Sequence, residues 1–206
     1  MILSHLSDVP IVAILRGLKP DNAIAVAEIL YSAGIRAVEV PMNSPEPIKS
    51  IQRIRKHLHT DCAVGAGTVT TVEACRAVLD TGSRLIISPH TDGQLIDFTV
   101  KNGGISLPGV FSPTDAFTAI KAGAHGLKLF PSATGGIPHY KAIKAVLPPE
   151  IPVLAVGGVG LHNAGDWLDA GVNGLGIGSA IFKPDWSLET IETAAKRFVA
   201  QIQETP

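Results

Sequence analysis

The sequence predicts an α/β fold, a single-domain (β/α)8 TIM barrel that spans residues 1–206. Eight short apolar runs alternate with longer helical patterns. The unit repeats roughly every 20–26 residues, about the shortest length that one strand, one helix and two loops can occupy. Eight such units in one chain are typical of this barrel. A doubly wound open sheet is the alternative, but it would usually have fewer strands and one dominant glycine-rich loop.

The expected strands are rich in Val, Ile and Leu, as parallel strands that are covered by helices should be. They comprise residues 11–15, 37–41, 63–67, 85–88, 105–108, 126–130, 153–156 and 174–177. Ahead of the first strand, residues 1–8 are expected to form a short helix that covers the lower end of the barrel.

Serines and glycines mark the limits of the expected helices. Ser44 and Ser112 each stand before a proline, which is the pattern of an N-cap followed by a first-turn proline. Ser112 also forms a capping-box pattern with Asp115, and Ser187 precedes the last helix. Five glycines stand where a helix should end before the next strand: Gly34, Gly82, Gly103, Gly123 and Gly171.

The composition excludes several classes of function. Hydrophobic residues make up 46% of the chain and charged residues 17%, which is enough apolar material for a large core. The net charge of −1 gives no basis for binding nucleic acid or an anionic membrane, and no apolar stretch could span a bilayer. The start of the chain lacks a signal-peptide pattern, and Cys62 and Cys75 make no disulfide framework, so a cytoplasmic protein is expected.

Lys128 is the most informative residue for function. Active sites of such barrels lie at the C-terminal ends of the strands. Within the apolar run 126–130, the alternation of side chains turns Lys128 toward the face opposite to Leu127 and Leu129. Burial lowers the pKa of a lysine, and the neutral amine can form a Schiff base with a carbonyl. The alternative is a lysine that extends to the strand end or pairs with a carboxylate.

Glu39 has the same setting as Lys128, since Val38 and Val40 would face the helices and Glu39 the barrel lumen. Two opposite charges inside one barrel are either a structural ion pair or an amine with a carboxylate that moves protons for it. The seven histidines form no metal-binding set, and few acidic residues other than Glu39 reach the predicted mouth. We therefore expect neither a metal nor a cofactor.

Two glycine-containing loops point to an anion site. Gly157-Gly158 and Gly178-Ser179 follow the seventh and eighth expected strands, where barrels of this kind commonly bind phosphate through backbone N–H groups. Other strand ends place Arg16 and Thr68 across the mouth, where they could bind a carboxylate. The alternatives are a rim salt bridge for Arg16 and a helix N-cap for Thr68.

Six segments resemble the KDPG/KHG aldolase family, in the family's order and over nearly the whole chain. They are IVAILRG (11–17), AVEVPMNSP (37–45), VGAGTV (64–69), ISP (87–89), LKLFPS (127–132) and AVGGV (155–159). The resemblance implies a metal-free class I aldolase that is usually a homotrimer, with Lys128 as the Schiff-base lysine and Glu39 as the acid/base. It also implies that substrate is bound by a set of strand-end and loop residues: Arg16, Thr68, Pro89, Val156, Gly157, Gly158, Gly178 and Ser179.

Within that family the chain looks closest to the 2-dehydro-3-deoxy-6-phosphogalactonate aldolases. Gluconate-type members tend to carry Thr-Gly-Gly where this chain has Val156-Gly157-Gly158, and often a polar residue such as arginine near Asn43-Ser44-Pro45. The implied reaction cleaves the phosphorylated sugar acid into pyruvate and D-glyceraldehyde 3-phosphate. Three alternatives stay open: the same chemistry on the gluconate epimer, a phosphosugar barrel enzyme that forms no imine, and a non-catalytic phosphosugar sensor.

Overall fold

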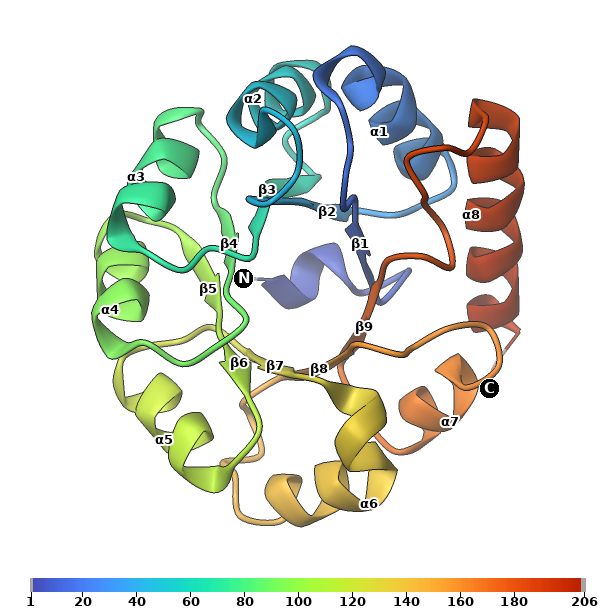
Figure 1. The fold of residues 1–206 in the computed structure, drawn as a ribbon. Coiled ribbons are helices and arrows are strands. Elements are labelled where there is room, and N and C mark those ends of the chain that lie inside the picture. The colour runs from blue at the N-terminus through green and yellow to red at the C-terminus, as the bar shows by residue number, and fades with distance from the viewer. Residues whose placement is uncertain (1, 205–206) are drawn as a thin grey trace.

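The structure is a computed structural model that describes residues 2–204, and its strands form one closed parallel ring (Figure 1). The sheet order is β5-β4-β3-β2-β1-β9-β8-β7-β6. The strands are β1 (Ile11–Ile14), β2 (Ala37–Pro41), β3 (Ala63–Gly67), β4 (Leu85–Ile87), β5 (Ile105–Leu107), β6 (Gly109–Val110), β7 (Leu127–Leu129), β8 (Val153–Val156) and β9 (Gly174–Ile177). The predicted barrel is confirmed.

The fifth barrel strand is interrupted, whereas the sequence predicts one continuous strand over residues 105–108. Only Pro108 separates β5 from β6; β5 pairs with β4, and β6 pairs with β7. The ring therefore closes through the chain itself, and the nine short strands make eight barrel strands. Proline has no N–H to donate to a neighbouring strand. Next to it, a Cβ on Gly109 would lie 2.4 Å from the Pro89 carbonyl carbon, so this crossing requires a glycine.

Helices surround the ring of strands (Figure 1). They are α1 (Ala23–Ser32), α2 (Pro47–His57), α3 (Val72–Asp80), α4 (Gly93–Lys101), α5 (Pro113–Lys121), α6 (Ser132–Lys144, kinked at Gly136), α7 (Ala164–Asp169) and α8 (Leu188–Gln203), with 3-10 turns η1 (Ile2–His5) and η2 (Pro20–Asn22). Among residues 2–204, no helix is both long and apolar enough to cross a membrane.

The predicted helix limits hold with one exception. Ser112 and Asp115 form the capping box of α5, and the Ser187 hydroxyl caps α8. All five helix-end glycines have positive φ. The prediction for Ser44 is wrong, because α2 begins at Pro47 behind Glu46. The Ser44 hydroxyl instead accepts a hydrogen bond from the Gly17 N–H at 3.0 Å and joins the loops that follow β1 and β2.

The hydrophobic core has two parts, one inside the ring and one between the ring and the helices. The inner part includes Val12, Leu107 and Leu154 together with Ile2 and Leu6, which precede the first strand. Ile2 is fully buried, and η1 lies within the ring in Figure 1. One end of the barrel is therefore filled by apolar side chains, and polar chemistry is confined to the other end.

Candidate active site

Lys128 points into the barrel lumen from the middle of β7. Its neighbours Leu127 and Leu129 pack outward against the helices, as strand alternation requires. Lys128 is only 7% exposed. Its Nζ atom lies 4.6 Å from the centre of the Phe130 ring, the next lumen-facing side chain. The predicted orientation of the lysine is confirmed.

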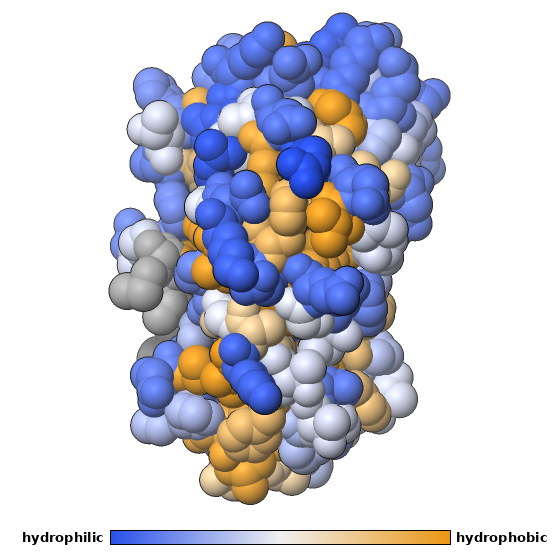
Figure 2. All heavy atoms as spheres, turned by 90° about the vertical axis from the view of Figure 1, so that its left-hand side faces the viewer, coloured by the Kyte–Doolittle hydropathy of each residue, from blue (hydrophilic) through white to orange (hydrophobic). Residues whose placement is uncertain are grey.

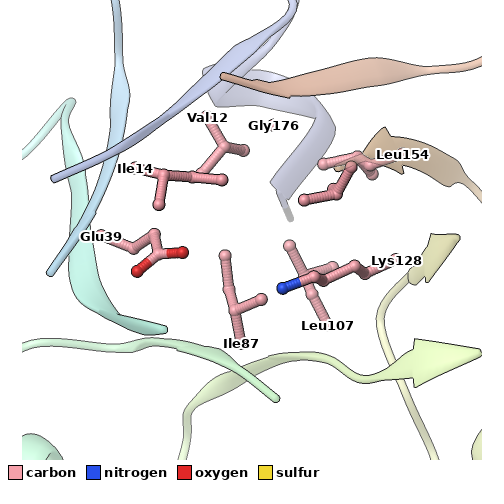
Figure 3. A pocket seen from close by; sticks show the side chains of 9 residues that line it. Val12, Ile14, Glu39, Ile87, Leu107, Lys128, Leu154 and Gly176 are labelled. Carbon is pink, nitrogen blue, oxygen red and sulfur yellow. The ribbon is translucent and has the colours of Figure 1, made fainter. Parts of the chain in front are cut away.

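Glu39 faces Lys128 across the lumen. Val38 and Val40 on either side of it belong to the outer core, and Glu39 itself is 2% exposed. Figure 3 shows the carboxyl and amine ends turned toward one another among aliphatic side chains such as Ile14 and Ile87. Within the part of the chain that is described, neither residue takes part in a salt bridge, and Glu39 Oε2 has no hydrogen-bond partner. This does not match the alternative of a structural ion pair.

Burial in the apolar lumen shifts the pKa of Glu39 and of Lys128 more than the charge of either group shifts the pKa of the other. Burial raises the pKa of Glu39 to about 7, against the opposing effects of the Lys128 and Arg16 charges and a hydrogen bond from Gly67. Burial also lowers the pKa of Lys128, and Arg16 lowers it further, whereas Glu39 raises it. Burial thus favours the uncharged amine of Lys128, and near neutral pH it faces a carboxyl group that can exchange protons.

A cleft of about 210 Å³ opens from this pair toward the C-terminal ends of the strands. It brings together eight of the ten predicted site residues: Arg16, Glu39, Lys128, Val156, Gly157, Gly158, Gly178 and Ser179. It is also lined by Phe130 and Val159, which were not predicted as site residues. Strand alternation already placed Phe130 on the lumen side, but nothing in the sequence marked it as part of the cleft.

Thr68 and Pro89 are not among the residues that line this cleft. Both follow barrel strands at the same end of the ring and are half-buried. Thr68 has a left-handed φ of 54°. The alternative role of Thr68 as a helix N-cap is wrong, because the N-cap of α3 is Thr71.

Arg16 is held at the rim of the cleft by a neighbouring loop. Its Nη1 donates to Asn43 Oδ1 at 2.7 Å, and the Gly17–Ser44 hydrogen bond lies directly beside this contact. In residues 2–204 no carboxylate forms an ion pair with Arg16, so the rim salt bridge is not seen. The exposed guanidinium therefore keeps donors free for an anion.

Four backbone amides at the end of the cleft lack partners. Across the described chain, no acceptor is bound by the N–H groups of Gly158, Val159, Ser179 and Ala180. Gly157 and Gly158 have φ of 93° and 77°, a backbone that side chains rarely allow. Asn163 fixes the turn, because its Nδ2 donates to the Gly158 oxygen at 3.0 Å. Unpartnered backbone N–H groups of this kind can bind an anion.

Ser132 supports the site, although no pattern in the sequence marks it. It is fully buried at the start of α6. Its hydroxyl donates to the Leu129 oxygen and accepts from the Val156 N–H, both at 2.8 Å. It thereby joins the strand that carries Lys128 to the strand that carries the Gly157–Gly158 turn. Among residues 2–204, no group of three His, Cys, Asp or Glu could hold a metal ion.

Known proteins resemble this chain over nearly its full length. A 2-dehydro-3-deoxy-6-phosphogalactonate aldolase of Escherichia coli is 42% identical over 95% of both chains. A solved structure described as native KDPGal superposes with a TM-score of 0.93 at 41% identity and 96% coverage of both chains. A KDPG aldolase from Legionella pneumophila, solved with pyruvate captured as a covalent carbinolamine, has a TM-score of 0.85 at 27% identity and 96% coverage of both. The family model for KDPG and KHG aldolase matches residues 2–195, so the chain belongs to that aldolase family.

Proposed function

We propose that this protein is a class I aldolase that cleaves 2-dehydro-3-deoxy-6-phospho-D-galactonate into pyruvate and D-glyceraldehyde 3-phosphate. The observation that carries the proposal is the buried Lys128 amine, whose pKa is lowered by burial and which faces Glu39 across the lumen. A neutral amine is the nucleophile that a Schiff-base aldolase needs. The relative from Legionella, which captures pyruvate covalently, supports the same chemistry in this family.

The reaction begins at the C2 ketone of the substrate. The Lys128 amine adds to C2 to give a carbinolamine, and its hydroxyl leaves as water with a proton from the Glu39 carboxyl group, which leaves an iminium ion and a Glu39 carboxylate. Glu39, as the carboxylate, takes the proton of the C4 hydroxyl. The C3–C4 bond then breaks, its electrons move toward the iminium nitrogen, and glyceraldehyde 3-phosphate leaves. C3 of the enamine takes back the proton that Glu39 gained, and water hydrolyses the new iminium to release pyruvate and the Lys128 amine. The covalent intermediate divides one difficult cleavage into easier steps.

The rest of the cleft would hold the two charged ends of the substrate. Arg16 is the candidate for the carboxylate, because a guanidinium fork matches its two oxygens. The four unpartnered amides after β8 and β9 are the candidate phosphate site. Fixing both ends would orient C2 against the amine, and this binding energy lowers the barrier. Thr68 stays a proposed contact of the carboxylate and Pro89 a proposed contact of the substrate, although the cleft does not include them.

The preference for the galactonate epimer is proposed from Val156 and from the galactonate-type relatives. Val156 lines the lumen and the cleft and is 6% exposed. Its apolar side chain offers no hydrogen bond to a C4 hydroxyl. The epimers differ only at C4, so the expected discrimination is modest, about 1–3 kcal/mol.

Two experiments test the proposed function. Borohydride reduction in the presence of pyruvate should attach a stable adduct to Lys128, found by peptide mass spectrometry, and the Lys128→Ala variant should neither react nor turn over. Pyruvate release from the two C4 epimers, compared as kcat/KM, should favour the galactonate. A variant without Lys128 that stays active would overturn the imine mechanism, whereas a preference for the gluconate would change only the substrate.

We also propose that the protein acts as a homotrimer in the cytoplasm, in galactonate catabolism. The trimer is implied by the family resemblance. Figure 2 shows hydrophobic surface among hydrophilic residues on the side of α3–α5. Phe111, just before α5, and Phe117, within α5, are 37% and 46% exposed and are candidates for burial between subunits. Light scattering of the purified protein should give three times the mass of the 206-residue chain.

A further inference from the structure

Gly67, the last residue of β3, lies directly against the carboxyl group of Glu39. A Cβ atom built on Gly67 would lie 2.0 Å from Glu39 Oε2 and 2.2 Å from both Cδ and Oε1. Every atom of the carboxyl group therefore occupies the space that any other residue at position 67 would fill. The Gly67 backbone also lowers the pKa of this carboxyl group.

The strand register explains this contact. Glu39 pairs with Gly65, and Pro41 pairs with Gly67. The Glu39 side chain therefore leans along β3 by two residues, toward the open end of the barrel. Ala63, at the start of β3, belongs to the inner core, so the alternate residues Gly65 and Gly67 face the lumen as well.

We propose that Gly67 is a positioning residue of the reaction: its lack of a side chain gives the Glu39 carboxylate its place in front of Lys128. The inference rests on the proposed proton transfer by Glu39. It adds that the geometry of this carboxylate is set by the neighbouring strand, since Glu39 has little polar support elsewhere and its Oε2 has no partner in residues 2–204.

Gly65 provides a contrast on the same face of the same strand. A Cβ on Gly65 would lie 1.7 Å from the Leu85 carbonyl oxygen, which is backbone of β4 and cannot move without opening the sheet. At Gly67 the obstacle is the free end of a flexible side chain. Alanine at position 65 should therefore damage the fold, and alanine at position 67 should displace the carboxylate.

The test compares Gly67→Ala with Gly65→Ala and the wild type. For Gly67→Ala we expect a thermal unfolding midpoint near that of the wild type, unchanged trapping of pyruvate by borohydride, and a kcat for cleavage lowered roughly 10- to 100-fold, because small misplacements of reacting groups have effects of that size. Gly65→Ala should instead lower the midpoint of unfolding. The acid limb of the pH–kcat profile should also move in Gly67→Ala, which a purely structural role would not cause.

A second variant pair tests the steric cause. Shortening the acid by Glu39→Asp withdraws the carboxylate from position 67, so the double variant Glu39→Asp/Gly67→Ala should be more active than the product of the two single effects predicts. Full kcat in Gly67→Ala, or a loss of stability equal to that of Gly65→Ala, would overturn the inference. If Glu39→Gln itself kept full turnover, the proposed role of Glu39 would fail instead, which separates the two outcomes.

Discussion

The Ser132 hydroxyl accepts a hydrogen bond from the Val156 N–H at 2.8 Å and, at the same distance, donates one to the Leu129 oxygen. This fully buried side chain thus joins the ends of β7 and β8, one residue beyond Lys128 and one residue before Gly157. The amine that we propose as the nucleophile and the turn that would bind phosphate are connected through a single hydroxyl.

Ser132→Ala should lower both stability and turnover. It removes both hydrogen bonds that this buried hydroxyl makes to the backbone, which costs about 1–3 kcal/mol in the free energy of unfolding. Urea unfolding measures this loss, and pyruvate release measures the accompanying fall in kcat/KM. Ser50→Ala is the matched control, since the equally buried Ser50 hydroxyl has no hydrogen-bond partner in residues 2–204 and its removal should leave stability nearly unchanged. Equal effects of the two substitutions would contradict the role of Ser132.

Lys128→Met should abolish turnover and keep the fold. Methionine has a similar length and carries no charge to desolvate, so the free energy of unfolding should stay equal or increase. No borohydride adduct should form. Circular dichroism and urea unfolding test the fold, and a coupled assay for pyruvate tests turnover. A folded Lys128→Met enzyme that still releases pyruvate would contradict the imine mechanism.

The kcat/KM of the wild-type enzyme should rise with pH through about 7, the raised pKa of Glu39. The base must be a carboxylate, so activity should fall about tenfold for each pH unit below that value. In Glu39→Gln the overall rate should drop, and the remaining acid limb should report Lys128. Lys128 should titrate at lower pH in this variant than in the wild type, because the Glu39 charge that raises its pKa is gone. An unchanged pH profile in Glu39→Gln would argue against Glu39 as the titrating base.

The same pKa shift predicts how stability depends on pH. A buried acid whose pKa is raised by folding stabilises the fold most below its unfolded pKa, 4.5 for Glu39, and this contribution is lost as pH rises toward the folded value. In Lys128→Met the ammonium that lowers the pKa of Glu39 is absent, so the loss should continue beyond pH 7. The free energy of unfolding should then fall by roughly 1.4 kcal/mol per pH unit. Urea unfolding between pH 4 and 8 should show no such fall in the double variant Lys128→Met/Glu39→Gln. The same fall in both variants would contradict burial of the Glu39 charge.

The features that the sequence predicts best depend on local periodicity. The directions of Lys128 and Glu39 follow from the two-residue repeat of a strand, which needs no knowledge of the rest of the fold. Contacts between distant segments could not be read in this way. Ser44 looked like an N-cap, but its hydroxyl binds the Gly17 amide, 27 residues away. The place of Thr68 depends on a left-handed backbone that a β-branched residue rarely adopts, and no local pattern marks it.

Val156→Thr should shift the preference between the C4 epimers toward the gluconate. Threonine has nearly the shape of valine, so the hydrogen bond between the Val156 backbone and Ser132 should persist, while a hydroxyl enters the lumen near the proposed position of C4. The ratio of kcat/KM for galactonate over gluconate should fall on the order of tenfold. Val159→Thr is the control, because Val159 lines the cleft beyond Gly158, at the phosphate end that both epimers share. If both substitutions changed the ratio equally, Val156 would not be the residue that distinguishes the epimers.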